Sequence, residues 1–151
     1  MTARTYPYAA LDLVQPLIDY AHTVEGRLEP SLATLVKIRA SQINGCALCL
    51  AMHAKEARAA GEREDRIVML DAWRETPLYS ERERAALGWT EALVRLPETH
   101  APDDAYEAMA AQFDETERVN LTLLVGVIMS FNQLGVGFRA KPAIATAKAA
   151  A

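Results

Sequence analysis

The chain has few of the residues that mark several large classes of protein. Only two of its 151 residues are cysteine, 7% are aromatic, and glycine and proline number seven each. Two cysteines are too few for the framework of a disulfide-rich secreted scaffold. Basic residues number 16 against 20 acidic residues, so the net charge is −4 and the basic excess of a nucleic-acid-binding protein is missing. We therefore expect no nucleic-acid partner.

The sequence also lacks a targeting segment of the usual kinds. The N-terminal residues contain no apolar run like that of a secretory signal. The longest apolar stretch, residues 119–138, approaches membrane-spanning length, but it contains polar side chains whose burial in lipid costs about 1 kcal/mol or more each. We therefore predict a core or oligomer helix here, no membrane partner and a cytoplasmic location. In that reducing compartment, paired cysteines are more often catalytic or metal-binding than structural.

Apolar residues make up 51% of the chain, and 28 residues are alanine. This apolar fraction is too high for a disordered chain, and the length fits one domain with a real core. Apolar residues recur at helical spacing, and no β-hairpin signal is present. We predict an all-α, single-domain helical bundle of about six to seven helices over residues 1–151, with 143–151 as a frayed tail. Because alanine buries little area, the thin core favours a homo-oligomer.

Capping residues place the ends of the predicted helices. Pro30 is placed to open a helix that ends near residues 42–44, and Asn44 is predicted to cap the next helix, which runs to about Ala60 before Gly61. Ser80 and the glutamate three residues later form a capping-box pattern. The remaining helices are expected to begin near Pro16 and to span residues 64–74, 80–96, 103–112 and 116–138, with a loop over 97–102.

The sharpest local feature is the sequence CALCLAMH, from Cys46 to His53. On a helix, Cys46, Cys49 and His53 share one face because they are three and four residues apart. A Cys-x-x-Cys pair can close a disulfide with little backbone movement, and His53 can accept a proton from Cys49. The combination suits dithiol chemistry, in which one thiolate attacks and the other resolves the product as a disulfide.

Other interpretations of this motif stay open. Two buried cysteines can serve simply as small apolar residues. A zinc site competes as well, but the motif offers three candidate ligands where structural zinc usually takes four, and nothing in the sequence places His22 or His100 nearby. A thioredoxin fold is disfavoured because its βαβ context is absent. We expect neither a metal nor a cofactor.

Longer segments around the motif resemble a known family. The segments are LVKIRASQINGCALC at residues 35–49, His53, AAGE at 59–62, and stretches at 70–75, 81–87 and 131–134. Together they resemble the alkylhydroperoxidase D-like (AhpD-like) core of the carboxymuconolactone decarboxylase-like superfamily, over about residues 28–139. The resemblance implies an all-helical homo-oligomer, often a trimer or hexamer. It also implies a hydroperoxide substrate and a dithiol or protein reductant, because the branch with paired cysteines is associated with hydroperoxide reduction. The decarboxylase branch lacks the pair.

The resemblance also implies roles for the two thiols. Cys49 is expected to be the peroxidatic thiol, activated by His53, and Cys46 the more accessible resolving thiol that exchanges with an electron donor. The residues themselves point both ways, because the helix N-terminus favours a thiolate at Cys46 whereas the neighbouring base favours Cys49. We favour Cys49, since a base within reach acts directly on its proton.

The chain departs from the family at one position of the expected proton relay. A glutamate usually stands immediately before the LVK segment, and here that residue is Thr34, which is no general base near neutral pH. Glu91 is a candidate carboxylate from another helix. Lys37 and Ser41 are further supporting candidates, although each also suits a structural role. The loss of the glutamate keeps an alternative function open, a non-catalytic or redox-sensing oligomeric helical protein of the same family with weak or no peroxidase activity.

Overall fold

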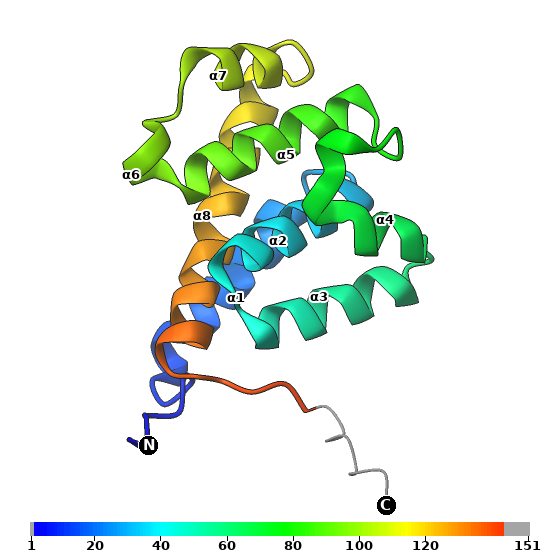
Figure 1. The fold of residues 1–151 in the computed structure, drawn as a ribbon. Helices are drawn as coiled ribbons and strands as arrows, with labels where there is room; N and C mark the ends of the chain where they lie inside the picture. Colours follow the sequence, from blue (N-terminus) through cyan, green and yellow to red (C-terminus); the bar gives the residue numbers. More distant parts are fainter. Residues whose placement is uncertain (1, 144–151) are drawn as a thin grey trace, which may run out of the picture.

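The computed structural model describes residues 2–143, and within this range all regular structure is helical (Figure 1). The predicted all-α class is confirmed. Where six or seven helices were expected, the described residues form eight α-helices and one 3₁₀-helix. In chain order they are α1 (Leu11–Glu25), α2 (Pro30–Asn44), α3 (Ala47–Ala59), α4 (Glu64–Val68), η1 (Met69–Glu75), α5 (Glu81–Val94), α6 (Leu96–Thr99), α7 (Asp103–Ala110) and α8 (Glu115–Gly137).

Helix α2 lies at the centre of the bundle and packs against α3, α5 and α8 (Figure 1). Two clusters of buried side chains meet on it. Leu32 and Val36 belong to the larger cluster, which they form with residues of α5, α7 and α8. Leu35 and Ile38 belong to the second cluster, with residues of α3, α4 and η1. Because α2 is buried on both sides, its position fixes where the chain turns into α3.

Helix α8 is long and apolar enough to cross a membrane by length and composition alone. In the bundle it packs against α1, α2, α3, α5 and α7, and 44% of its most apolar window is buried inside the protein. Its two buried asparagines have partners within the fold, since Asn120 donates to the Val24 carbonyl and Asn132 donates to the Ser41 hydroxyl. The helix therefore has the packing of a core helix.

Several predicted helix ends are confirmed. Pro30 lies in the first turn of α2, Gly61 follows α3 with a left-handed φ of 84°, and Ser80 opens α5 with a complete capping box. The predicted N-cap at Asn44 is wrong. Asn44 is the last residue of α2, and its side-chain amide donates to Asn132 Oδ1 at 3.0 Å instead of capping α3.

Three other boundaries differ from the prediction. Helix α1 begins before Pro16, which lies inside it on the exposed side. The helix predicted over residues 64–74 is divided into α4 and the tighter η1, whose turn brings both Leu70 and Trp73 into the core. The predicted loop over 97–102 begins as α6, because Pro97 fits a first helical turn, where no backbone N–H is needed. The predicted tail lies outside the described residues, apart from Ala143.

Candidate active site

The two cysteines lie at the start of α3. Gly45 adopts a left-handed conformation with φ 67° and reverses the chain between α2 and α3. Cys46 is then the N-cap residue of α3, and its Sγ accepts the Cys49 backbone N–H at 3.3 Å. The two side chains are joined by a disulfide across a Cα–Cα distance of 5.3 Å. The prediction that this spacing closes a disulfide is confirmed.

Helix α8 passes directly over the cysteine pair at Gly135. A Cβ built on Gly135 would lie 2.6 Å from Cys46 Sγ and 3.6 Å from Cys49 Sγ. Real Cβ atoms do not approach sulfur as closely as the first of these distances, so only glycine fits here without displacement. The backbone of α8 therefore forms one wall of the cysteine site.

Ser41 supports the turn that precedes the cysteines. It is fully buried, and its hydroxyl donates to the Lys37 carbonyl at 2.8 Å and accepts from Asn132 at 3.0 Å. Its own carbonyl accepts the Cys46 backbone N–H at 3.0 Å. Ser41 does not line the cavity described next, so the structure gives it a positioning contact with the cysteine turn rather than a contact with a ligand.

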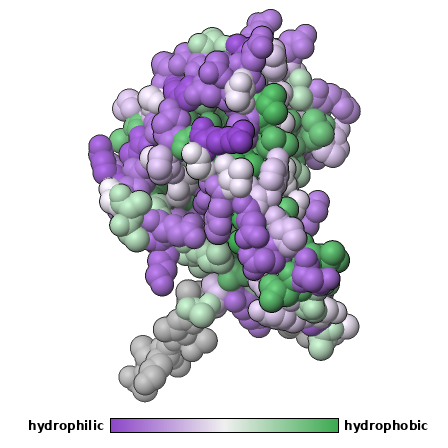
Figure 2. Space-filling model, turned by 180° about the vertical axis from the view of Figure 1, so that it is seen from behind, coloured by the Kyte–Doolittle hydropathy of each residue, from purple (hydrophilic) through white to green (hydrophobic). Residues whose placement is uncertain are grey.

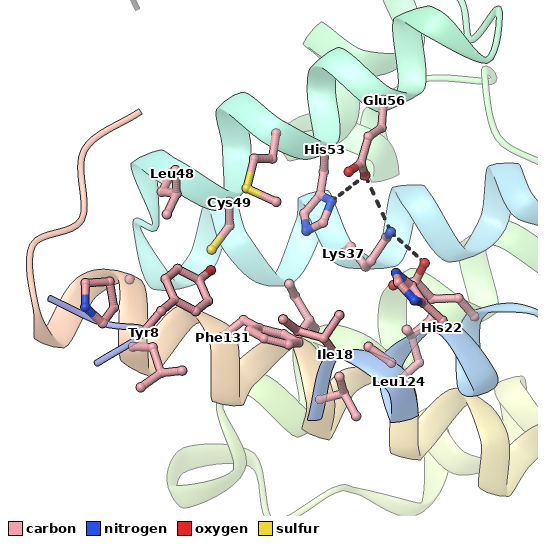
Figure 3. A pocket seen from close by; sticks show the side chains of 18 residues that line it. Tyr8, Ile18, His22, Lys37, Leu48, Cys49, His53, Glu56, Leu124 and Phe131 are labelled. Carbon is pink, nitrogen blue, oxygen red and sulfur yellow. Dashed lines mark hydrogen bonds and ion pairs between the residues drawn. The ribbon is translucent and has the colours of Figure 1, made fainter. Parts of the chain in front are cut away.

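A cavity of about 280 Å³ lies between α1, α3 and α8, and Cys49 and His53 line it from the same face of α3 (Figure 3). Most of its wall is apolar, including Leu48, Leu124 and Phe131. Cys46 does not line the cavity and is 1% exposed, whereas Cys49 is 6% exposed. The expectation that Cys46 is the more accessible thiol is therefore wrong for this structure, because the α8 backbone at Gly135 covers its sulfur.

The imidazole of His53 is held by a carboxylate on its own helix. Nδ1 of His53 lies 2.8 Å from Glu56 Oε2 (Figure 3). An ionised carboxylate only accepts hydrogen bonds, so neutral His53 carries its proton on Nδ1 and its lone pair on Nε2. Burial lowers the pKa of His53, against the opposing effect of Glu56. The site thus holds a neutral imidazole with a free basic nitrogen.

Lys37 ties three helices together at the polar end of the cavity. Its Nζ lies 3.1 Å from Glu25 of α1 and 3.6 Å from Glu56 of α3, and its side chain is 8% exposed. Burial raises the pKa of Glu56, but the hydrogen bond from His53 and the charge of Lys37 outweigh this and leave that pKa below its usual value. Lys37 thus pairs with two carboxylates, and its side chain also lines the cavity.

Two of the proposed supporting residues lie outside this site. Thr34 donates its hydroxyl to the Pro30 carbonyl of its own helix at 2.8 Å and does not line the cavity. Glu91 is buried in another network, where it accepts hydrogen bonds from Arg39 at 2.8 Å, from Trp73 at 2.9 Å and from Arg74. The structure therefore brings neither residue to His53, and the carboxylate that contacts this histidine is Glu56.

Sequence reasoning missed several residues of the site, among them His22, which lines the cavity although nothing in the sequence placed it near the motif. Glu56 was detectable from its spacing, because it follows His53 by three residues on the same helix face. Glu25 and Tyr8 reach the cavity only through tertiary packing, and no local pattern marks them. Within residues 2–143, no group of three or more histidine, cysteine or acidic side chains is arranged to hold a metal ion.

The fold and the site together place this protein in a class. It is an all-helical thiol protein, with a cysteine pair at the start of one helix and a histidine one turn after the second cysteine. The sequence profile of the carboxymuconolactone decarboxylase family matches residues 9–92. This chain belongs to that family.

Individual relatives agree with this assignment. YdfG of Bacillus subtilis (strain 168) is 38% identical over 115 residues, which are 76% of this chain and 78% of that protein. YnjA of Escherichia coli (strain K12) is 30% identical over 116 residues, 76% of this chain and 63% of that protein. Both relatives are uncharacterized. An Agrobacterium tumefaciens protein of unknown function, for which the role of the antioxidant defence protein AhpD has been suggested, has a crystal structure that is similar with a TM-score of 0.89. That protein is 40% identical, and the match covers 95% of this chain and 100% of that one, so the fold is AhpD-like.

Proposed function

We propose that this protein is a thiol-dependent peroxidase that reduces organic hydroperoxides through a Cys46–Cys49 dithiol/disulfide cycle. The observation that carries the proposal is the shared cavity of Cys49 and His53, with His53 Nδ1 fixed by Glu56. The fixed tautomer leaves Nε2 as a base on the cavity side of α3. Its place four residues after Cys49 suits it to accept the thiol proton of that residue.

The proposed reaction begins with the reduced pair. His53 takes the proton of the Cys49 thiol, and the thiolate attacks one peroxide oxygen. The O–O bond breaks, Cys49 becomes a sulfenic acid, and the departing alkoxide takes the proton from His53 as an alcohol. Cys46 then attacks the Cys49 sulfur, which forms the disulfide and releases water.

A dithiol reductant completes the cycle by becoming a disulfide itself. We propose that its thiolate attacks Cys49, the sulfur that lines the cavity, and that Cys46 leaves. The Cys49 backbone N–H at 3.3 Å favours this direction, because it stabilises negative charge on the departing Cys46 sulfur. In sum, one hydroperoxide and one dithiol yield an alcohol, water and a disulfide.

The cavity favours a substrate with a neutral apolar group. At about 280 Å³ it far exceeds the ~30 Å³ that one water occupies in the liquid. Its polar end holds one lysine between two carboxylates, so a further carboxylate from the substrate would be repelled. We therefore propose cumene hydroperoxide as a better model substrate than hydrogen peroxide or a fatty-acid hydroperoxide.

The test is hydroperoxide consumption with dithiothreitol as reductant, measured for wild type, Cys49→Ser and Cys46→Ser. Wild type should turn over, and Cys49→Ser should be inactive. Cys46→Ser, reduced and then freed of dithiothreitol, should consume one equivalent and leave a sulfenic acid that mass spectrometry detects on Cys49. Equal, near-zero rates for wild type and Cys49→Ser would refute the proposal. Activity retained by Cys49→Ser and lost by Cys46→Ser would reverse the two roles.

The alternative is a redox-sensing protein without turnover, and the 1% exposure of Cys46 is the observation that favours it. A sensor forms the disulfide once per oxidation event and changes its stability or assembly when it does so. Its disulfide would form stoichiometrically with hydroperoxide, but dithiothreitol would reduce that disulfide too slowly for multiple turnover.

A further inference from the structure

The segment before α1 closes one end of the cavity. Pro7 and Tyr8 line the cavity together with residues of α1, α2, α3 and α8, and they are the lining residues that come from outside the described helices. In Figure 3, the ring of Tyr8 lies beside Leu48 and Cys49, and its hydroxyl is directed toward Cys49. We call residues 2–9, which precede the N-cap residue of α1, the N-terminal arm.

Few polar contacts hold this arm in place. Arg4 donates to the Gly137 carbonyl at the end of α8, and a turn joins the Ala9 N–H to the Tyr6 carbonyl at 3.1 Å. The rings of Tyr6 and Tyr8 lie 5.7 Å apart. Because the arm is not helical, it can be displaced without unfolding any element of the bundle.

The two ends of the cavity differ in exposure. At the polar end, the lining residues Glu56 and His22 are exposed, with a side-chain exposure of 52% for Glu56 (Figure 3). At the other end, Cys49 is 6% exposed and the half-buried Tyr8 lies against it (Figure 3). A reagent that enters at the open end passes His53 before it meets Cys49. The route to Cys49 from the arm side is blocked by Tyr8.

We propose that Tyr8 is a specificity-determining residue that closes the cysteine end of the cavity, so that only ligands that fit along the cavity reach Cys49. This role covers both reaction partners of Cys49, the oxidant and the reductant. Its significance for hydroperoxides depends on the proposed function, but the closure itself is a property of the fold. The aromatic ring, not the hydroxyl, supplies the barrier.

The test uses alkylation of the reduced full-length protein and needs no peroxide. Cys49 is labelled with iodoacetamide, which is small, and with fluorescein-5-maleimide, which is bulky and polar, and mass spectrometry gives the rate for each cysteine. Tyr8→Ala should raise the ratio of the bulky to the small reagent's rate at Cys49 about tenfold, the scale on which pocket size discriminates ligands. Tyr8→Phe, which keeps the ring, should retain the wild-type ratio. Tyr20→Ala, which removes an exposed tyrosine of α1 that does not line the cavity, is the matched control.

An unchanged ratio in Tyr8→Ala, or an equal rise in Tyr20→Ala, would overturn the proposal. So would a Tyr8→Phe variant that behaves like Tyr8→Ala, because the ring would then not be the barrier. Circular dichroism shows whether each variant keeps the helical fold. If wild type consumes no hydroperoxide and the ratio still rises in Tyr8→Ala, the proposed function fails and the closure stands. If wild type turns over and the ratio is unchanged in Tyr8→Ala, the proposed function stands and the closure by Tyr8 fails.

Discussion

His53 donates its Nδ1 proton to Glu56 across 2.8 Å, and both residues belong to α3. The base and the carboxylate that orients it are therefore supplied by the same helix that begins with the cysteine pair. Thr34 stands where the family usually has a glutamate, and its hydroxyl donates to the Pro30 carbonyl of its own helix. The substitution at Thr34 therefore does not leave the histidine without a carboxylate.

The first prediction concerns Glu56→Gln, which keeps the hydrogen-bond acceptor and removes the charge. Glu56 raises the pKa of His53 against the lowering effect of burial, so its neutralisation should lower that pKa further. A weaker base should reduce the plateau of kcat/KM for cumene hydroperoxide by about tenfold and move the acid limb of the pH profile to lower pH. The pH profile and an NMR titration of His53 measure the two effects.

A suitable control for this variant is Glu64→Gln. Glu64 forms an exposed ion pair with Arg58 at 2.7 Å and does not line the cavity. It should leave both the plateau and the His53 titration unchanged. An unshifted His53 titration in Glu56→Gln would contradict the orienting role of Glu56.

The second prediction concerns stability against pH. Burial lowers the pKa of His53 in the folded protein, so the folded state binds fewer protons than the unfolded chain as pH falls below the ordinary value of about 6.5. The free energy of unfolding should therefore fall with pH from that point until the lower folded-state pKa is passed. Urea titrations of wild type and His53→Gln at several pH values should show this slope in wild type alone. Parallel curves would show that His53 titrates equally in both states.

The cysteine–histidine face could be predicted from the sequence because helical spacing is local. Cys49 and His53 are four residues apart, and any helix through them places them together. Glu56 obeys the same rule and was equally accessible to it. By contrast, the contact of Gly135 with Cys46 joins residues 89 positions apart, and the salt bridge of Lys37 to Glu25 depends on how α1 crosses α2. Such contacts follow from packing between helices, which a single sequence does not specify.

The third prediction separates Glu91 from the chemistry. Its side chain and that of Arg39 are 9% and 6% exposed and form an ion pair at 2.8 Å. Glu91→Gln should weaken the buried pair and lower the free energy of unfolding by about 1–3 kcal/mol, since Arg39 keeps its pair with Asp71. When the rate of hydroperoxide consumption is divided by the fraction of molecules that are folded, it should equal the wild-type value. Glu98→Gln, an exposed glutamate of α6, should change neither quantity. A loss of rate without a loss of stability would return Glu91 to the catalytic site.

The fourth prediction concerns assembly, which the sequence led us to expect as a homo-oligomer. Val119 and Leu123 lie one turn apart on α8 and are 61% and 41% exposed. The face seen in Figure 2 is largely polar, with apolar side chains gathered in patches. Leu123→Lys should lower the mass measured by sedimentation velocity, because a lysine buried in the interface would oppose association through Val119 and Leu123. Ala108→Lys, on the exposed side of α7, adds the same single positive charge and is the matched control. A wild-type monomer at micromolar concentration would refute the expectation of an oligomer.

The last prediction compares two glycines of α8. A Cβ on Gly135 would lie 2.6 Å from Cys46 Sγ, whereas a Cβ on Gly126 would meet nothing within 4 Å. Gly126→Ala should therefore stabilise the protein by about 0.5–1 kcal/mol, since alanine restricts the unfolded chain and favours helix. Gly135→Ala gains the same propensity but forces the disulfide or α8 to move, which costs about 1–3 kcal/mol in a packed interior.

The two variants should therefore change stability in opposite directions in urea titrations of the oxidised protein. The cost in Gly135→Ala should shrink after reduction, because a free Cys46 thiol can rotate away from the new methyl group while a disulfide sulfur cannot. The dithiothreitol concentration that reduces half of the protein should accordingly be lower for Gly135→Ala than for wild type, and unchanged for Gly126→Ala. Equal stabilisation by both alanines would mean that α8 does not press on the cysteine pair, and that something other than its backbone keeps Cys46 from solvent.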